Sequence, residues 1–215
     1  MDLGLEGRVV WLLGAGASAV WQLAEVFLEE GAVVRIVTTK GGGPTAGRLK
    51  LRFGRNLRAV FVGEHASLLT PSLLPHLLDV DQPHVIVLCQ MAVAMSQPSA
   101  HEWDEFVRLR GAELRSGGTV VVVEPHPAFE GEIEATETLA EWALMRQRAW
   151  YGFAPPSCAM SFIALSPTLW PAADRQGSEL RRASAQGISA LTVFMASRGR
   201  GRTAVVGEDG LPHLL

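Results

Sequence analysis

The stretch VVWLLGAGASAVWQLAEVFLEEGA, residues 9–32, decides the fold class of this chain. Its residues 9–13 form an apolar run without alternation, which is typical of a strand buried on both faces of a parallel sheet. After the glycines, apolar residues recur at three- and four-residue spacing from Val20 to Leu28, which predicts an amphipathic helix that ends at Gly31. The next run, AVVRIVTT, completes a strand–helix–strand unit, for which we expect a right-handed crossover.

Strand-like and helix-like patterns alternate along the rest of the chain. Apolar runs typical of strands lie at 58–63, 84–90, 118–125 and 159–167, with a short one at 203–207, and helical patterns lie at 69–78, 100–115, 135–150 and 179–197. This alternation predicts an α/β fold with a doubly wound parallel sheet between two helical layers. With 215 residues, the chain is expected to form a single domain, 1–215, in which the glycine-rich segment 40–48 is a flexible loop.

Composition excludes several classes of function. The net charge of −3 provides no basic excess for binding phosphates, so we expect no nucleic-acid partner. The six histidines show no ligand spacing, and we expect no metal. The N-terminus has no basic region before its apolar run, and no stretch is long enough to span a membrane, which indicates a cytoplasmic protein without membrane contact.

Four segments resemble the short-chain dehydrogenase/reductase family, and together they cover nearly the whole chain. They are LEGRVVWLLGAG, FLEEGAVVRIV, GGTVVVVEP and LTVFMASRGRGRTAVVGEDG. The resemblance implies the Rossmann-like fold of that family. It also implies the family's chemistry, in which a nicotinamide cofactor oxidises alcohols or reduces carbonyl groups.

The turn that binds the cofactor departs from the family pattern. The family places glycines as Gly-x-x-x-Gly-x-Gly, so that bare backbone approaches the pyrophosphate at a helix N-terminus. Here Gly14 matches the first glycine, whereas Ser18 and Val20 replace the others. A valine removes both the permissive backbone and the space beside the phosphates. In a second register, Gly14, Gly16 and Ala19 fit the looser Gly-x-Gly-x-x-Ala pattern, so that binding stays an alternative.

The segment after the second predicted strand offers no carboxylate for a ribose hydroxyl. It reads Thr38, Thr39, Lys40, and the lysine would favour a 2′-phosphorylated cofactor if it is more than an exposed loop residue. The candidate cofactor-binding residues are therefore Gly14, Gly16, Ser18 and Lys40. We expect a site that binds no cofactor, or NADP weakly.

The catalytic residues of the family are missing. The family uses a tyrosine, a lysine four residues later, a serine and an asparagine. This chain has one tyrosine, Tyr151, and Pro155 stands four residues after it. Its lysines, Lys40 and Lys50, and its asparagine, Asn56, all come far upstream. We therefore expect no catalytic residues of the family's kind.

Alignment with the family places other residue types at these positions. The tyrosine and lysine positions fall near Glu137 and Glu141, and the serine position falls at Pro125. A carboxylate in place of a cation reverses the local field, so it would not activate a phenol. Relocated chemistry is a further hypothesis, because Glu124 and His126 follow a predicted strand and could form an acid–base pair.

Two helical segments carry more apolar surface than one sheet contact requires. The helix over 135–153 has one stripe of Leu139, Trp142, Ala143, Trp150 and Phe153, and a second of Ala140, Leu144 and Tyr151. The resemblance implies that this helix and the one at 100–115 form a dimer interface, and that the C-terminal segment GEDGLPHLL forms another. We expect Trp142 and Trp150 to be the anchors of such an interface.

These observations favour a non-catalytic subunit that pairs with an active paralogous dehydrogenase subunit, in an expected tetramer with two copies of each chain. It resembles in kind a two-subunit alcohol dehydrogenase for a benzylic hydroxyacyl-CoA in anaerobic toluene breakdown, one subunit of which has lost its catalytic residues. The alternatives are a nucleotide-binding sensor or regulator, and an NADP-dependent oxidoreductase with relocated catalytic residues.

Overall fold

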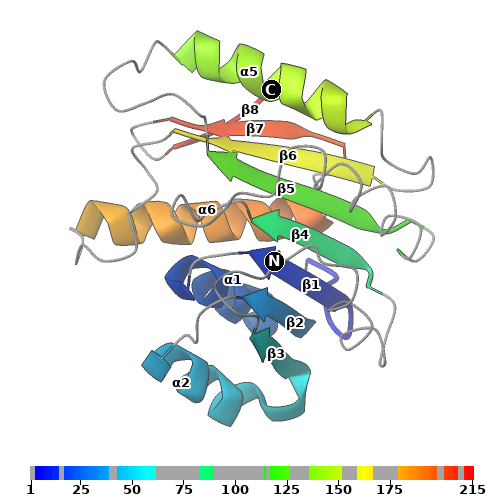
Figure 1. The fold of residues 1–215 in the computed structure, drawn as a ribbon, viewed down its shortest axis with the longest axis vertical. Coiled ribbons are helices and arrows are strands. Elements are labelled where there is room, and N and C mark those ends of the chain that lie inside the picture. Colours follow the sequence, from blue (N-terminus) through cyan, green and yellow to red (C-terminus); the bar gives the residue numbers. More distant parts are fainter. Residues whose placement is uncertain are drawn as a thin grey trace.

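The computed structural model describes residues 3–14, 17–38, 43–61, 83–89, 114, 117–125, 136–151, 159–166, 179–197, 201–207 and 211–215. These residues form one sheet with the strand order β3-β2-β1-β4-β5-β6-β7-β8 (Figure 1). The strands are β1 Val9–Gly14, β2 Val33–Thr38, β3 Leu57–Phe61, β4 Val85–Cys89, β5 Thr119–Pro125, β6 Ala159–Leu165, β7 Thr203–Val206 and β8 Pro212–Leu214. All neighbouring pairs are parallel except β7 and β8. The predicted doubly wound parallel sheet is confirmed.

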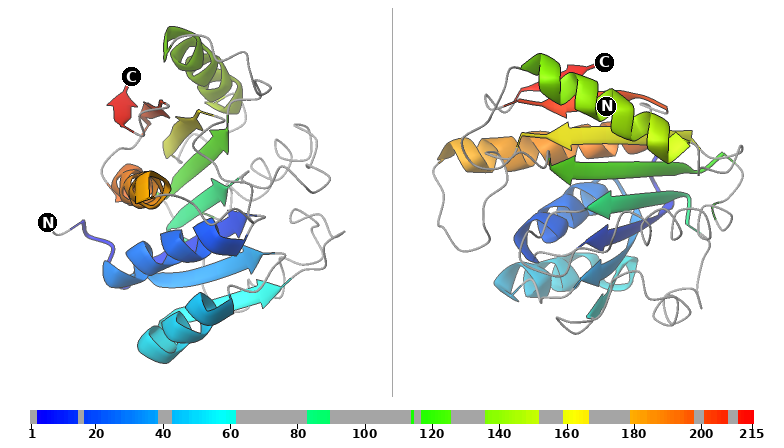
Figure 2. Two further views of the ribbon diagram at one scale, coloured as in Figure 1. Left: turned by 90° about the vertical axis from the view of Figure 1, so that its left-hand side faces the viewer. Right: turned by 45° about the horizontal axis from the view of Figure 1, so that its top comes forward.

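Helices cover both faces of the sheet, which gives the predicted three layers. They are α1 Ala17–Glu29, α2 Gly43–Phe53, α5 Thr136–Tyr151 and α6 Glu179–Ser197, with a short 3₁₀ turn η1 Gly54–Asn56. Helices α1 and α6 contact each other on one face, and α5 contacts β6 and β7 on the other (Figure 2). The helices expected at 69–78 and 100–115 lie outside the described residues.

Burial on both faces explains why the central strands have no polar alternation. Along β1, Val10 and Leu12 belong to the core beneath α1 and α6, whereas Trp11 and Leu13 belong to the core on the α5 side. All four side chains are buried. A strand covered by helices on both sides must be apolar at every position, which is the pattern that identified it in the sequence.

The prediction that residues 40–48 form a loop is wrong from Gly43 onward, because α2 begins there. Pro44 is compatible with a first helical turn, where its missing N–H would have no intrahelical partner. Leu49 is fully buried, and Phe53 packs against the same core. Tertiary packing of this apolar side therefore outweighs the low helix propensity of the glycines and the proline.

Two ion pairs join α2 to α1. Arg48 Nη1 lies 2.7 Å from Glu25 Oε1, and Arg52 Nη1 lies 3.0 Å from Glu29 Oε1. Both arginines are largely exposed, so each pair contributes little to stability.

The inner side of α5 packs on the sheet. Leu139 and Ala143 are buried, as the first predicted stripe requires. The Trp142 ring meets Phe162 of β6 edge-on, with 5.8 Å between ring centroids, so this tryptophan contacts the protein's own core. Among the helices that the structure describes, none has the length and apolar character to cross a membrane.

Candidate functional site

The parallel strands bring their C-terminal ends to one edge of the sheet, where folds of this type bind ligands (Figure 1). Gly14 ends β1 and lies in register with Cys89, which ends β4. Thr38 ends β2 and lies in register with Phe61, which ends β3. Pro125 ends β5. Any dinucleotide or catalytic chemistry of this fold would lie at this edge.

β1, β4 and α1 come so close together at Gly14 that a larger residue would not fit there without a shift. A Cβ at this position would lie 2.9 Å from Cys89 Cβ, 3.0 Å from the Cys89 carbonyl oxygen and 3.0 Å from Val20 Cγ2. The close packing at the end of β1 therefore requires a glycine at the first glycine position of the family pattern.

Val20 occupies the space between α1 and the strand. Its side chain is fully buried, and one methyl group packs toward Gly14. In the first register, this position belongs to the third glycine, which permits close packing of helix against strand. The valine therefore does not fit the family's phosphate-binding turn in that register. The second register depends on Gly16 and on the side chain of Ala19, which the structure does not describe.

The ribose end of the site also lacks the usual binding group. Thr38 is fully buried at the end of β2, and the sequence from Gly31 to Gly63 contains no Asp or Glu. The carboxylate that holds a ribose 2′-hydroxyl in this fold has no counterpart there. The described residues thus offer no carboxylate for the ribose of NAD, whereas Gly16 and Lys40, which could serve NADP, lie outside them.

Of the predicted cofactor-binding residues, Gly14 alone has a described environment. Ser18 lies in the first turn of α1, but its side chain lies outside the described residues. Gly16 and Lys40 lie outside them altogether. The roles assigned to these three residues stay predictions.

Cys89 is a core residue at the end of β4. Its side chain is buried, and this burial raises the pKa of the thiol from 9.0 to about 12. The thiol is therefore neutral at physiological pH and cannot act as a nucleophile.

Glu124 forms an ion pair that sequence reasoning missed. Arg146 Nη2 donates to Glu124 Oε1 at 3.0 Å, and Arg146 Nε donates to Glu124 Oε2 at 3.2 Å. Both side chains are mostly buried, with 21% of Arg146 and 11% of Glu124 exposed. The only signals in the sequence were an arginine within the apolar stripe of α5 and a glutamate at the end of an apolar strand.

This ion pair weakens the hypothesis of relocated acid–base chemistry. Both Glu124 oxygens accept hydrogen bonds from one guanidinium, so the carboxylate serves to join β5 to α5. The proposed partner, His126, lies outside the described residues. Within the described ranges, no group of three or more His, Cys, Asp or Glu residues could hold a metal ion.

The chain's tyrosine lies at the wrong end of α5 for the family's chemistry. Helix α5 leads from β5 to β6, so it starts near the ligand-binding edge and runs toward the opposite edge (Figure 1). Glu137, at the aligned tyrosine position, is in its first turn, and Tyr151 is its last residue. At about 1.5 Å per residue, the two positions are roughly 21 Å apart along the helix.

Comparison with solved structures finds proteins of similar fold. The chain is similar to a carbonyl reductase from Pseudomonas aeruginosa PAO1 solved in complex with NADP, with 20% identity, a TM-score of 0.60 and 97% of this chain and 99% of that chain covered. It is also similar to a short-chain dehydrogenase/reductase from Brucella melitensis, described as a glucose/ribitol dehydrogenase. Here the identity is 12% and the TM-score 0.60, and the match covers 98% of this chain and 99% of that chain. A third similar structure is a short-chain dehydrogenase/reductase from Serratia marcescens, with 12% identity, a TM-score of 0.60 and 96% of this chain and 98% of that chain covered.

At these identities the similarity concerns the fold. No family model and no curated protein matches the sequence. The chain thus has the fold of the short-chain dehydrogenase/reductases over nearly its full length.

Proposed function

We propose that this chain is the non-catalytic subunit of a hetero-oligomeric short-chain dehydrogenase. In this assembly an active paralogous subunit oxidises an alcohol or reduces a carbonyl group. The observation that carries the proposal is a dehydrogenase fold without its proton-transfer residues. The tyrosine is at the far end of α5, and both lysines, Lys40 and Lys50, precede β3.

The groups found at the ligand-binding edge support this proposal. The Cys89 thiol is buried and neutral, and the Glu124 carboxylate is held by Arg146. Neither can take over the acid–base role of the missing tyrosine. The chain's contribution would then be to stabilise its partner and shape the partner's site.

The outer side of α5 supplies the proposed contact surface. Leu144 is 37% exposed and Met145 is 59% exposed, on a helix whose Leu139 and Ala143 already face the sheet. Ala140 packs against the core, and the side chains of Trp150 and Tyr151 lie outside the described residues. We assign Leu144 and Met145, rather than Trp142, to the contact with the partner.

A nucleotide-binding regulator is the second candidate. The observation in its favour is Gly14, which stands at the first glycine position of the family pattern and leaves no room for a Cβ beside Cys89. The NADP in the similar carbonyl reductase makes this cofactor the natural one to test.

Copurification from the native host, followed by mass spectrometry and native mass spectrometry, tests the subunit role. We expect a soluble complex with two copies of this chain and two of a dehydrogenase subunit. The change Met145→Glu should dissociate it, because a charge would be buried in an apolar contact. The matched control is Leu51→Glu on α2, a strongly exposed leucine outside the proposed contact surface.

Three results would overturn the proposal. They are a stable monomer indifferent to dehydrogenase subunits, equal effects of the two glutamate variants, and turnover of NAD or NADP by the isolated chain.

A further inference from the structure

We infer that Trp21 and Phe61 fill the adenosine end of the dinucleotide site, so that the chain closes this site with its own aromatic side chains. The inference deepens the proposed function and rests on it, because a subunit without hydride chemistry has no need of a bound nicotinamide cofactor. It concerns what has taken the place of the cofactor.

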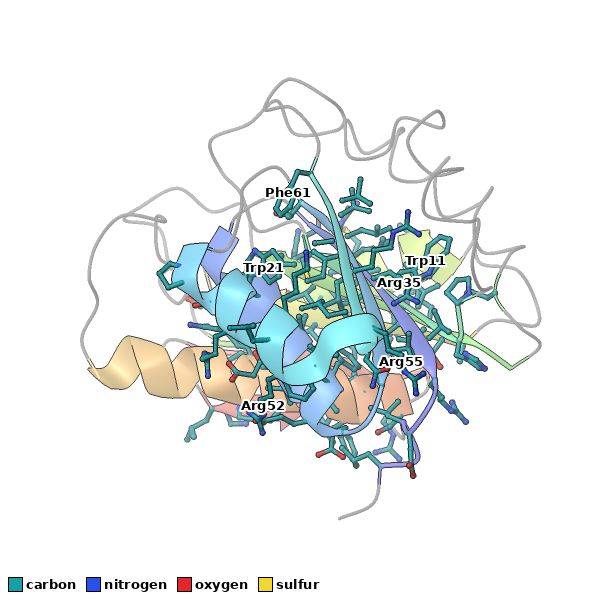
Figure 3. The ribbon with its side chains drawn as sticks, turned by 90° about the horizontal axis from the view of Figure 1, so that it is seen from below. Trp11, Trp21, Arg35, Arg52, Arg55 and Phe61 are labelled. Carbon is teal, nitrogen blue, oxygen red and sulfur yellow. The ribbon has the colours of Figure 1, made fainter. Side chains whose placement is uncertain are left out.

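The sheet register gives the position of Phe61, and the ring contact places Trp21 beside it. Phe61 ends β3 and lies beside Thr38, the end of β2. Trp21 comes from the N-terminal half of α1 (Figure 3). In doubly wound folds, the ribose and its 2′-substituent lie at the end of the second strand, near this helix N-terminus. The two rings therefore meet where the adenosine would lie.

The two rings are stacked. Their centroids are 6.4 Å apart, and their planes are inclined by 26°. This geometry is an offset stack of the kind that an adenine ring would make with an aromatic side chain. The phenyl ring thus gives Trp21 the stacking contact that a nucleobase could otherwise provide.

Trp21 is a residue of the hydrophobic core. Its side chain is only 2% exposed and belongs to the core that contains Val20. Its indole Nε1–H has no hydrogen-bond partner among the residues that the structure describes. Apolar contact and stacking, rather than a hydrogen bond, hold the indole in place.

Phe61 is the exposed half of the pair. It is 55% exposed and lies on the edge strand, so its ring can be removed with little loss of core packing. Any dinucleotide has to displace this ring before its adenosine reaches the end of β2. The wild-type chain should therefore bind dinucleotides poorly, and truncation of Phe61 should open the site.

Calorimetric titration of the full-length chain with NADP⁺ and NAD⁺ tests this inference. For the wild type we expect no saturable binding below about 1 mM. For Phe61→Ala we expect at least about tenfold tighter binding of one of the two, which corresponds to about 1.4 kcal/mol. The matched control is Leu51→Ala, an exposed apolar residue on the neighbouring α2, which should bind no better than the wild type.

A second variant distinguishes removal of an aromatic ring from the site from loss of the folded state. Trp21→Leu keeps an apolar side chain in the core and removes the indole, and it should also bind more tightly than the wild type if circular dichroism shows it folded. Micromolar binding by the wild type would overturn the inference. So would folded Phe61→Ala protein that binds no better than Leu51→Ala. Either result leaves copurification with a dehydrogenase subunit as an independent test of the proposed function.

Discussion

Replacing Arg146 by methionine should destabilise the protein much more than replacing an exposed arginine. The change removes the guanidinium from both Glu124 oxygens while it keeps an apolar side chain of similar length on α5. The carboxylate then stays at the end of β5 in a site where little of its surface reaches water.

The magnitude follows from the burial of the pair. Breaking a fully buried ion pair by removing one partner costs about 3–5 kcal/mol, whereas an exposed pair is worth about 0–1 kcal/mol. With 21% and 11% of the two side chains exposed, the Glu124–Arg146 pair lies nearer the buried limit. We expect a loss of about 2–3 kcal/mol in the free energy of unfolding for Arg146→Met. For a chain of this size, that lowers Tm by roughly 4–12 °C.

Urea unfolding followed by circular dichroism measures the effect, and a matched control lies on α2. Arg48 forms an ion pair of 2.7 Å with Glu25, but 58% of its side chain is exposed. Arg48→Met should therefore cost at most about 1 kcal/mol. The double variant Glu124→Leu/Arg146→Met should lie within about 1 kcal/mol of the wild type, because apolar residues often replace a buried ion pair without loss.

Two outcomes would refute this reasoning. The first is an Arg146→Met variant no less stable than Arg48→Met. The second is strict additivity of the Glu124→Leu and Arg146→Met effects, which would mean that the two side chains do not interact across the joint between β5 and α5.

Two further predictions concern the turn and the thiol beside it. Gly14→Ala should lower the free energy of unfolding by about 1–3 kcal/mol, because its Cβ would overlap with Cys89 and Val20. Gly47→Ala on α2, where nothing lies within 4 Å of the added Cβ, should be neutral or stabilising. Equal Tm values for the two variants would contradict the close approach at Gly14. Cys89 should resist alkylation by iodoacetamide at pH 8 until the protein unfolds, as measured by peptide mass spectrometry, which separates it from Cys158. Its raised pKa implies that the free energy of unfolding falls as the pH rises from 9.0 toward 12, since the thiol of the unfolded chain ionises first. Rapid labelling of Cys89 in the native protein would exclude its burial.

The fold class was already determined by the amino-acid sequence. Strands covered on both faces are almost entirely apolar, so β1 and β4 are visible as continuous runs. Helix α6 begins and ends at the predicted residues, 179 and 197. The lack of the family's motif of a tyrosine and a lysine four residues later is also a property of the sequence, because Pro155 stands four residues after the one tyrosine, Tyr151.

Contacts between distant residues were decided only by the tertiary structure. Helix α2 forms in a segment rich in glycine because Leu49 reaches the core, and local propensity does not report that burial. Glu124 and Arg146 meet because α5 packs on β6, the strand that pairs with β5. The rings of Trp21 and Phe61 meet because β3 adds to the sheet beside β2. Composition and periodicity record whether a residue is buried, but the three-dimensional packing determines which residue it is buried against.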